Sequence, residues 1–135
     1  MTARVFADTN IAVYMLGADP VKRRAAVAIM RANPVISVQV VNEFLSVAVN
    51  KIKLDRPMAN RLAQILMRRC EVQEMNIGTV QHAIDLGERY QLSHWDALIV
   101  SSALQAGCVT LCSEDMQHGQ VFEGRVQVSN PFVVA

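Results

Sequence analysis

The sequence lacks the features that mark membrane and secreted proteins. Its longest apolar runs are far shorter than the ~20 residues that a bilayer-spanning helix requires, although 52% of the chain is hydrophobic. The N-terminal segment MTARVFADTN does not have the charged, apolar and small-residue order of a signal peptide. We therefore expect a soluble, cytoplasmic protein without a membrane partner, in which the apolar residues fill the core of a single domain over residues 1–135.

Cysteine is scarce and histidine is scattered. The three cysteines, Cys70, Cys108 and Cys112, have neither Cys-x-x-Cys spacing nor paired histidines, so they do not indicate a zinc site. Buried thiols in a reducing cytosol are the interpretation that fits them best. The three histidines are far apart in the sequence, and we expect surface or core positions for them and no metal ligation.

The chain also lacks a strong net charge of either sign. Its 13 basic and 12 acidic residues leave a formal charge of +1, so the overall charge does not indicate nucleic-acid binding. Two local basic clusters could still contact a phosphate backbone: KRR at residues 22–24 and KIKLDR at residues 51–56. Each cluster, taken alone, is also typical of a solvated helix face.

Short apolar runs alternate with segments of helical periodicity. The strand candidates are RVFA (4–7), PVISV (34–38), CEVQEM (70–75), CVTLC (108–112) and RVQVS (125–129). The helix that follows the first strand is predicted to begin at Asp19-Pro20, with Val21, Ala25, Ala28, Ile29 and Ala32 on one face. Because parallel strands require crossover connections, this alternation predicts an α/β fold: a three-layer α/β/α sandwich with a mainly parallel central sheet of four to five strands.

Four acidic residues occupy positions that a hydrophobic core does not require. Asp8 follows the first strand and Asp115 follows the fourth, so both are expected as neighbours at the carboxyl edge of the sheet, where ligands bind. Glu43 lies inside an apolar helical segment and Asp96 near the start of another, each on the face predicted to turn inward. Each position except that of Glu43 also has a simple structural interpretation: Asp8 as a helix cap, Asp96 in a capping box with Ser93, and Asp115 in a turn.

Together the four carboxylates favour a site for a hard divalent cation, because clustered carboxylates repel one another unless a cation offsets their charge. Oxygen ligands without histidine or cysteine suit Mg²⁺ or Mn²⁺. Such a site is typical of phosphate chemistry, in which the cation bridges phosphate oxygens and lowers the pKa of a bound water. An aspartyl-phosphate phosphotransferase is disfavoured, because it needs a second carboxylate two residues after Asp8, where this sequence has Asn10.

The same segments resemble the PIN-domain ribonucleases, in particular the VapC-like toxins of type II toxin–antitoxin pairs. The resemblance covers nearly the whole chain and is carried in order by ADTNI, VNEFL, HWDALIVSSAL, CSEDMQHG and VSNPF. It implies that Asp8, Glu43, Asp96 and Asp115 form a catalytic pocket that binds Mg²⁺ or Mn²⁺. Glu114 stands beside Asp115, and the family pattern favours Asp115 as the residue that reaches the metal.

The resemblance also implies the reaction and the partners. Thr9 and Ser113 match hydroxyl positions that support the pocket. The expected activity is metal-dependent hydrolysis of phosphodiester bonds in single-stranded or looped RNA, and the expected protein partner is an antitoxin whose C-terminal arm lies across the groove. Apolar faces in VVNEFLSVAV and MANRLAQILM, together with the resemblance, predict a homodimer. The alternative is a non-catalytic PIN-like module that binds RNA or a protein.

Overall fold

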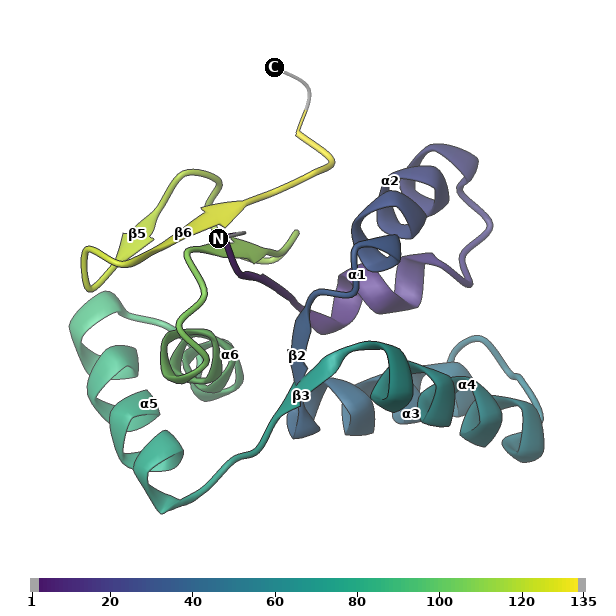
Figure 1. Ribbon diagram of the computed structural model, residues 1–135, viewed down its shortest axis with the longest axis horizontal. Coiled ribbons are helices and arrows are strands. Elements are labelled where there is room, and N and C mark those ends of the chain that lie inside the picture. The colour runs from purple at the N-terminus through teal and green to yellow at the C-terminus, as the bar shows by residue number, and fades with distance from the viewer. Residues whose placement is uncertain (1–2, 134–135) are drawn as a thin grey trace.

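The computed structural model describes residues 3–133, which fold around one mixed sheet (Figure 1). Within this range the strands are β1 (Val5–Ala7), β2 (Val35–Ser37), β3 (Glu71–Gln73), β4 (Thr110–Cys112), β5 (Val121–Phe122) and β6 (Val126–Ser129). Their order across the sheet is β3-β2-β1-β4-β6-β5. Every neighbouring pair is parallel except β5 and β6, which are antiparallel.

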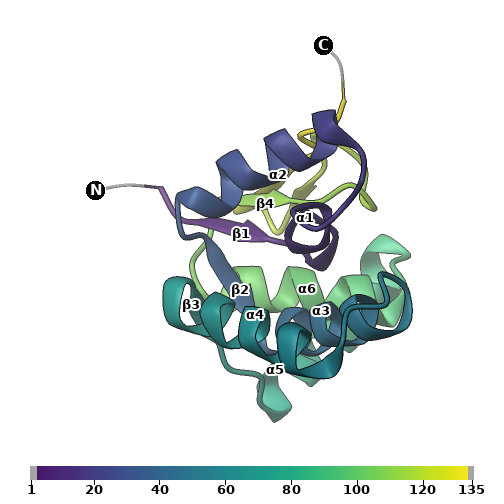
Figure 2. The same ribbon diagram turned by 90° about the vertical axis from the view of Figure 1, so that its right-hand side faces the viewer.

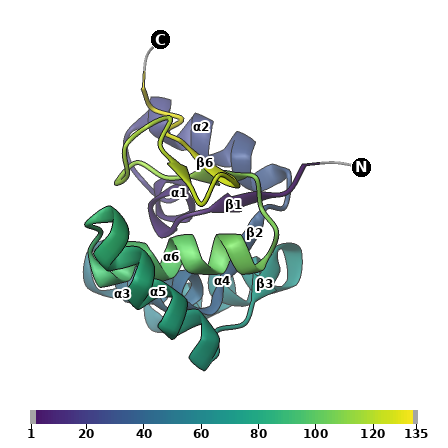
Figure 3. The same ribbon diagram turned by 90° about the vertical axis from the view of Figure 1, so that its left-hand side faces the viewer.

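Helices cover both faces of this sheet. They are α1 (Thr9–Tyr14), α2 (Pro20–Arg31), α3 (Val38–Asn50), α4 (Arg56–Arg69), α5 (Ile77–Tyr90) and α6 (His94–Gln105). Helices α1 to α4 lie on one side of the sheet and face the viewer in Figure 2, with α1 at the carboxyl end of β1, whereas α5 and α6 lie on the other side and face the viewer in Figure 3. The predicted α/β class, with a mainly parallel sheet between two helical layers, is confirmed.

Strand β1 is central, and its position explains its composition. It pairs with β2 on one side and β4 on the other, and Phe6 and Ala7 are both fully buried. A parallel strand covered on both faces tolerates apolar side chains at every position, which is why RVFA has no polar alternation. The backbone N–H of Asp8 extends the β1–β4 pairing by donating to the carbonyl of Cys112 at 2.9 Å. The first polar residue after β1 is therefore held at the carboxyl edge.

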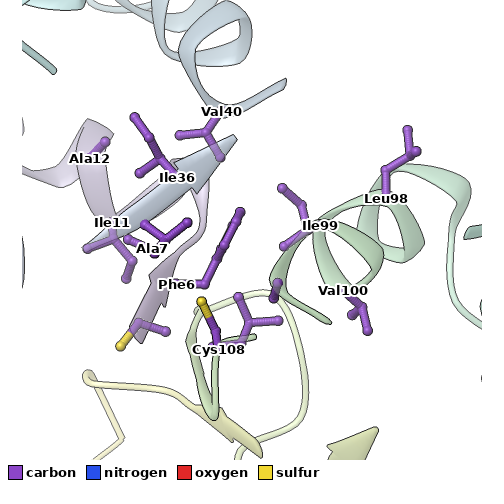
Figure 4. Packing of buried hydrophobic residues seen from close by; sticks show 14 of the residues in the cluster. Phe6, Ala7, Ile11, Ala12, Ile36, Val40, Leu98, Ile99, Val100 and Cys108 are labelled. Carbon is purple, nitrogen blue, oxygen red and sulfur yellow. The ribbon is translucent and has the colours of Figure 1, made fainter. Parts of the chain in front are cut away.

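The hydrophobic core fills both faces of the sheet, and one part of it lies between the sheet and α6. Phe6 on β1 packs between Ile36 of β2 and Ile99 of α6 (Figure 4). Every residue of α6 from Ala97 to Leu104 is buried, so this helix is covered on all sides, and α5 packs along it. Close packing around α6 leaves little freedom for its first turn, which carries Asp96.

Two sequence predictions about the elements require correction. The sheet within residues 3–133 has six strands because a short strand, β5, joins β6 through a tight turn in which both Glu123 and Gly124 have positive φ. Two residues are too few to show a periodicity, and the Glu-Gly turn was the available signal. The apolar face predicted for α2 is also not the buried one: Ala26 and Met30 are buried, whereas Val21 is 71% exposed.

Other predictions about local structure hold. Asp19 caps α2 by accepting hydrogen bonds from the backbone N–H groups of Val21 and Lys22. All three cysteines are buried and free, as expected of core thiols. Among the residues that the structure describes, no helix is both long enough and apolar enough to cross a bilayer.

Candidate metal centre

Three of the four predicted carboxylates meet at the carboxyl edge of the sheet. Asp8 follows β1, Asp115 lies in the loop after β4, and Asp96 stands in the first turn of α6. One carboxylate oxygen from each lies within 4.8 Å of the other two. Oxygen ligands of a Mg²⁺ ion lie ~2.1 Å from the metal and so at most about 4 Å apart, which modest side-chain rotation would achieve here. These residues therefore fit a divalent cation with oxygen ligands.

Asp8 is the most enclosed of the three, with 4% of its surface exposed. Its Oδ1 accepts a hydrogen bond from the backbone N–H of Thr9, and its Oδ2 accepts one from the hydroxyl of Ser113, each at 2.7 Å. Burial nevertheless raises the pKa of Asp8 to about 6, because the two hydrogen bonds only partly offset desolvation and the charges of Asp115 and Asp96 add to it. A bound cation would relieve that cost.

Asp96 on α6 and Asp115 in the loop after β4 complete the cluster. Burial, followed by the negative charge of Asp115, raises the pKa of Asp96. The cap of α6 is Ser93, whose hydroxyl accepts from the backbone N–H of Asp96 at 3.2 Å. Asp115 is exposed, and its Oδ2 accepts from the side-chain amide of Asn10 at 3.0 Å. The carboxylate of Asp96 therefore lies with the cluster even though its backbone belongs to a capped turn.

Glu43 lines the same pocket without belonging to the group of three. The hydroxyl of Thr9 donates to Glu43 Oε1 at 2.7 Å, and the side-chain amide of Gln39 donates to the same oxygen at 3.3 Å. Glu43 is half-buried on the side of α3 that faces the pocket, whereas its neighbour Phe44 enters the core. The helix thus turns Glu43 toward the site and not into the apolar interior.

The structure separates Glu114 from Asp115. The carboxylate of Glu114 accepts a hydrogen bond from the hydroxyl of Tyr14 and pairs with the ammonium of Lys22 at 2.7 Å. Lys22 also lies over the ring of Tyr14, at 4.7 Å from its centroid. Adjacent residues in this loop point to different neighbours, so it is Asp115 that lies with Asp8 and Asp96.

One cavity joins these groups. Its volume is about 350 Å³, and its lining includes all four predicted carboxylates and Thr9. Asn10, Gln39 and Trp95 also line it and were not singled out from the sequence, whereas Lys51, which lines it too, belongs to one of the two predicted basic clusters. For Gln39 and Lys51 a signal existed, because they stand four residues before and eight residues after Glu43 and so share its helix face.

In the basic cluster at residues 22–24, both arginines are exposed and only Lys22 pairs with a carboxylate. Lys22 is engaged by Glu114, and Arg23 donates to the backbone carbonyl of Gly17 at 3.2 Å. In the second cluster, Lys51 lines the cavity, and Lys53 is exposed outside it. Any phosphate contact near the acidic cluster is therefore expected from Lys51.

A family model for the PIN domain matches residues 5–121 of this sequence. The chain therefore belongs to the PIN domain family. No protein with a curated description matches it in sequence.

Solved structures of the same fold include several from toxin–antitoxin systems. A toxin–antitoxin complex from Klebsiella pneumoniae matches with a TM-score of 0.71 at 20% identity, over 98% of this chain and 100% of that one. DNA-bound VapBC from Salmonella typhimurium matches with a TM-score of 0.69 at 13% identity, over 96% and 99%. Mycobacterium tuberculosis VapC20, described as a sarcin-ricin loop cleaving toxin, matches with a TM-score of 0.66 at 17% identity, over 79% and 86%.

Proposed function

We propose that this protein is a metal-dependent endoribonuclease that hydrolyses RNA phosphodiester bonds and serves as the toxin of a toxin–antitoxin pair. The observation that carries the proposal is the meeting of Asp8, Asp96 and Asp115 in one cavity that, within residues 3–133, has no histidine or cysteine in its lining. Membership of the PIN domain family and the toxins among proteins of the same fold support it. Buried residues from Phe6 to Val128 form one hydrophobic cluster, and a single core of this extent favours a single PIN-like domain over residues 1–135.

The residues of the cavity would have different roles in this reaction. Asp8, Asp96 and Asp115 would hold Mg²⁺ or Mn²⁺ with Glu43 beside them, and the bound ion would polarise the phosphate and lower the pKa of an attacking water. Ser113 and the backbone of Thr9 hold the Asp8 carboxylate in place through its two oxygens. Within residues 3–133 both hydrogen bonds to Glu43 fall on Oε1, so Oε2 keeps its lone pairs available to accept a proton from water.

Cleavage of an RNA panel tests the function directly. Purified protein is incubated with single-stranded and hairpin RNAs in Mg²⁺, in Mn²⁺ and in EDTA, beside an Asp8→Asn variant prepared identically. We expect products only with the divalent ions and only from the wild type. If the wild type cleaves nothing yet binds RNA or a protein, the non-catalytic PIN-like module is the correct interpretation.

Glu114 and Asp115 form a matched pair for testing the assignment of the fourth carboxylate. Asp115→Asn should lower kcat by at least about 100-fold, because it removes a charged ligand from the cluster. Glu114→Gln should stay within about threefold of wild type, because Glu114 interacts with Lys22 and Tyr14 away from the cluster. Initial rates of the two variants at saturating Mn²⁺ provide the measurement. A larger loss from Glu114→Gln than from Asp115→Asn would make Glu114 the metal ligand instead of Asp115.

We also propose an antitoxin partner that supplies a cation to the pocket. An arginine guanidinium can bind two carboxylates through parallel hydrogen bonds and would replace the metal charge while blocking the cavity. Toxin–antitoxin complexes among the proteins of the same fold support this proposal. Added Mn²⁺ should compete with such a partner, and substitution of the partner's arginine should restore cleavage in the mixture.

The homodimer remains a proposal, and the structure suggests a different surface for it. The apolar faces of α3 and α4 are largely used against each other and the core. Helix α5 instead exposes Ile77, Val80 and Ile84 along one stripe, at 76%, 40% and 53% exposure. We expect a dimer at micromolar concentration in sedimentation equilibrium. Ile84→Asp should yield monomers, whereas Met67→Asp on the exposed side of α4 should leave the dimer intact.

A further inference from the structure

The single tryptophan of this chain stands at the rim of the candidate metal centre. Trp95 directly precedes Asp96, lines the same cavity and is 64% exposed. Among the large hydrophobic side chains exposed within residues 3–133 it is the only aromatic one. Burial of an indole is strongly favourable, so an exposed one beside a polar cavity indicates a surface that a flat apolar group covers.

The surroundings of Trp95 hold its backbone and support its ring. Its carbonyl accepts a hydrogen bond at 3.2 Å from the side-chain amide of Gln39, which also donates to Glu43. The ring of His94 packs edge-on against the indole, with centroids 5.6 Å apart. Trp95 is therefore linked to the wall that carries Glu43, which makes it a positioned platform at the cavity mouth.

The wall of the cavity that carries Glu43 is one face of α3. Gln39, Glu43, Val47 and Lys51 all line it, and they follow one another at intervals of four residues. At the rise of an α-helix, Lys51 lies about 12 Å along the axis from Glu43. Lys51 is exposed, and within the described part of the chain it is the one cationic side chain among the residues that line this cavity. The cavity thus has a carboxylate cluster in its interior, a cation at the end of one wall and an aromatic ring at its rim.

We propose that this cavity is a binding groove for single-stranded RNA in which Trp95 stacks on an unpaired base and Lys51 contacts a backbone phosphate further along the strand. The inference rests on the proposed function, because it assumes that the carboxylate cluster acts on RNA. A base stacks on an aromatic ring only when it is unpaired, so the groove selects loops and single strands against duplexes. The stacking tolerates any base, so Trp95 contributes selection for unpaired structure and not for sequence.

Fluorescence of Trp95 reports on this contact without ambiguity, because no other tryptophan is present. The wild-type protein is titrated with a mixed-sequence single-stranded RNA dodecamer in Ca²⁺, and the RNA is recovered intact afterwards. We expect saturable quenching by the single strand and none by the same sequence in a duplex. Absence of quenching by the single strand would overturn the proposal, as would equal quenching by the duplex.

Matched variants separate the two contacts. Trp95→Ala should weaken dodecamer binding about 10-fold, measured by anisotropy of a labelled strand, while Trp95→Phe keeps most of the affinity. Lys51→Gln should weaken binding and reduce the salt slope by about 0.7, whereas Lys53→Gln, two residues away and outside the cavity, should leave both unchanged. Equal losses of affinity from Lys51→Gln and Lys53→Gln would indicate a diffuse electrostatic attraction and would overturn the proposed contact between Lys51 and a backbone phosphate.

Cleavage assays distinguish this inference from the proposed function. If the wild type cleaves RNA, Trp95→Ala should raise KM about 10-fold with kcat nearly unchanged, since stacking stabilises bound substrate and transition state alike. An unchanged KM would overturn the inference and leave the nuclease in place. If the wild type does not cleave RNA, and single-stranded RNA still quenches the fluorescence of Trp95, the proposed binding groove is supported and the proposed nuclease activity is contradicted. Quenching that follows protein concentration and not RNA would assign Trp95 to an interface between proteins, which overturns the proposal.

Discussion

Asp96→Asn is expected to abolish cleavage while leaving the fold intact. Asparagine keeps the shape of the side chain but removes one of three charges that converge within 4.8 Å. The cation that those charges attract contributes several kcal/mol of transition-state stabilisation, so kcat should fall about 1000-fold or more. Initial rates at saturating Mg²⁺, with a thermal melt to verify folding, provide the measurement. Activity within about threefold of wild type would remove Asp96 from the site.

Asp85→Asn is the matched control for this experiment. Asp85 lies on α5 and is not among the residues that line the cavity. Its carboxylate pairs with Arg89 on the exposed side of that helix. Its loss removes one surface carboxylate and one exposed ion pair, which contributes little to stability because solvent screens it. Full activity of Asp85→Asn beside an inactive Asp96→Asn would show that position, and not total charge, decides the effect.

Asp8→Asn is expected to stabilise the metal-free protein while removing its activity. Ionisation of Asp8 is opposed by burial, and a pKa of about 6 against an ordinary value of 3.8 corresponds to a cost of about 3 kcal/mol at neutral pH. Asparagine removes the charge and keeps the cap on α1. After the lost Ser113 contact is subtracted, a gain of about 1–2 kcal/mol should raise Tm by roughly 3–6 °C in EDTA at pH 7.5.

The pH dependence of that difference follows from linkage. Because the folded state binds the Asp8 proton more tightly than the unfolded state, this group favours folding fully below pH 3.8. The contribution is lost as pH rises through about 6, so the wild type should lose stability relative to Asp8→Asn across this interval. Chelated melts between pH 4 and pH 7.5 should therefore diverge as pH increases. Parallel curves of Tm against pH for the two proteins would contradict a raised pKa of the buried Asp8 carboxyl group.

Added Mn²⁺ should reverse the order of the two proteins. At 100 times its Kd, an ion that binds only the folded pocket stabilises by about 2.7 kcal/mol, and wild type should receive most of this while Asp8→Asn receives little. Asp55→Asn is the control, since Asp55 is also the N-cap of a helix, α4, but lies on the surface. Equal metal-induced shifts in wild type and Asp8→Asn would exclude Asp8 as a ligand.

Sequence periodicity identified the main elements because each depends on local chemistry. The five predicted strand segments each contain an observed strand, and Asp19 with Pro20 begins a helix as predicted. The errors occur where tertiary packing decides. Val21 matches the helical period of α2 yet is exposed, because the sheet and α1 meet the opposite face, where Ala26 and Met30 are buried. Strand β5 is too short to leave a pattern at all.

The candidate site shows the same division. That Asp8 and Asp115 would be neighbours followed from the order of parallel strands, and the register of Ala7 opposite Cys112 brings them together. That Glu43 faces the pocket, half-buried and hydrogen-bonded to Thr9, depends on the rotation of α3 about its own axis. A helical period describes relative positions around one helix and carries no information on how that helix is rotated against its neighbours.

By itself the sequence determined the α/β class, the parallel sheet and the acidic residues at its carboxyl edge, because apolar periodicity and strand order act over short stretches of chain. Only the tertiary structure decided which adjacent carboxylate, Glu114 or Asp115, joins Asp8. Lys22 and Tyr14, about 90 to 100 positions earlier in the chain, hold Glu114 aside. It also decided that Trp95 and Lys51 border one cavity, since contacts between distant segments depend on packing that no local pattern encodes.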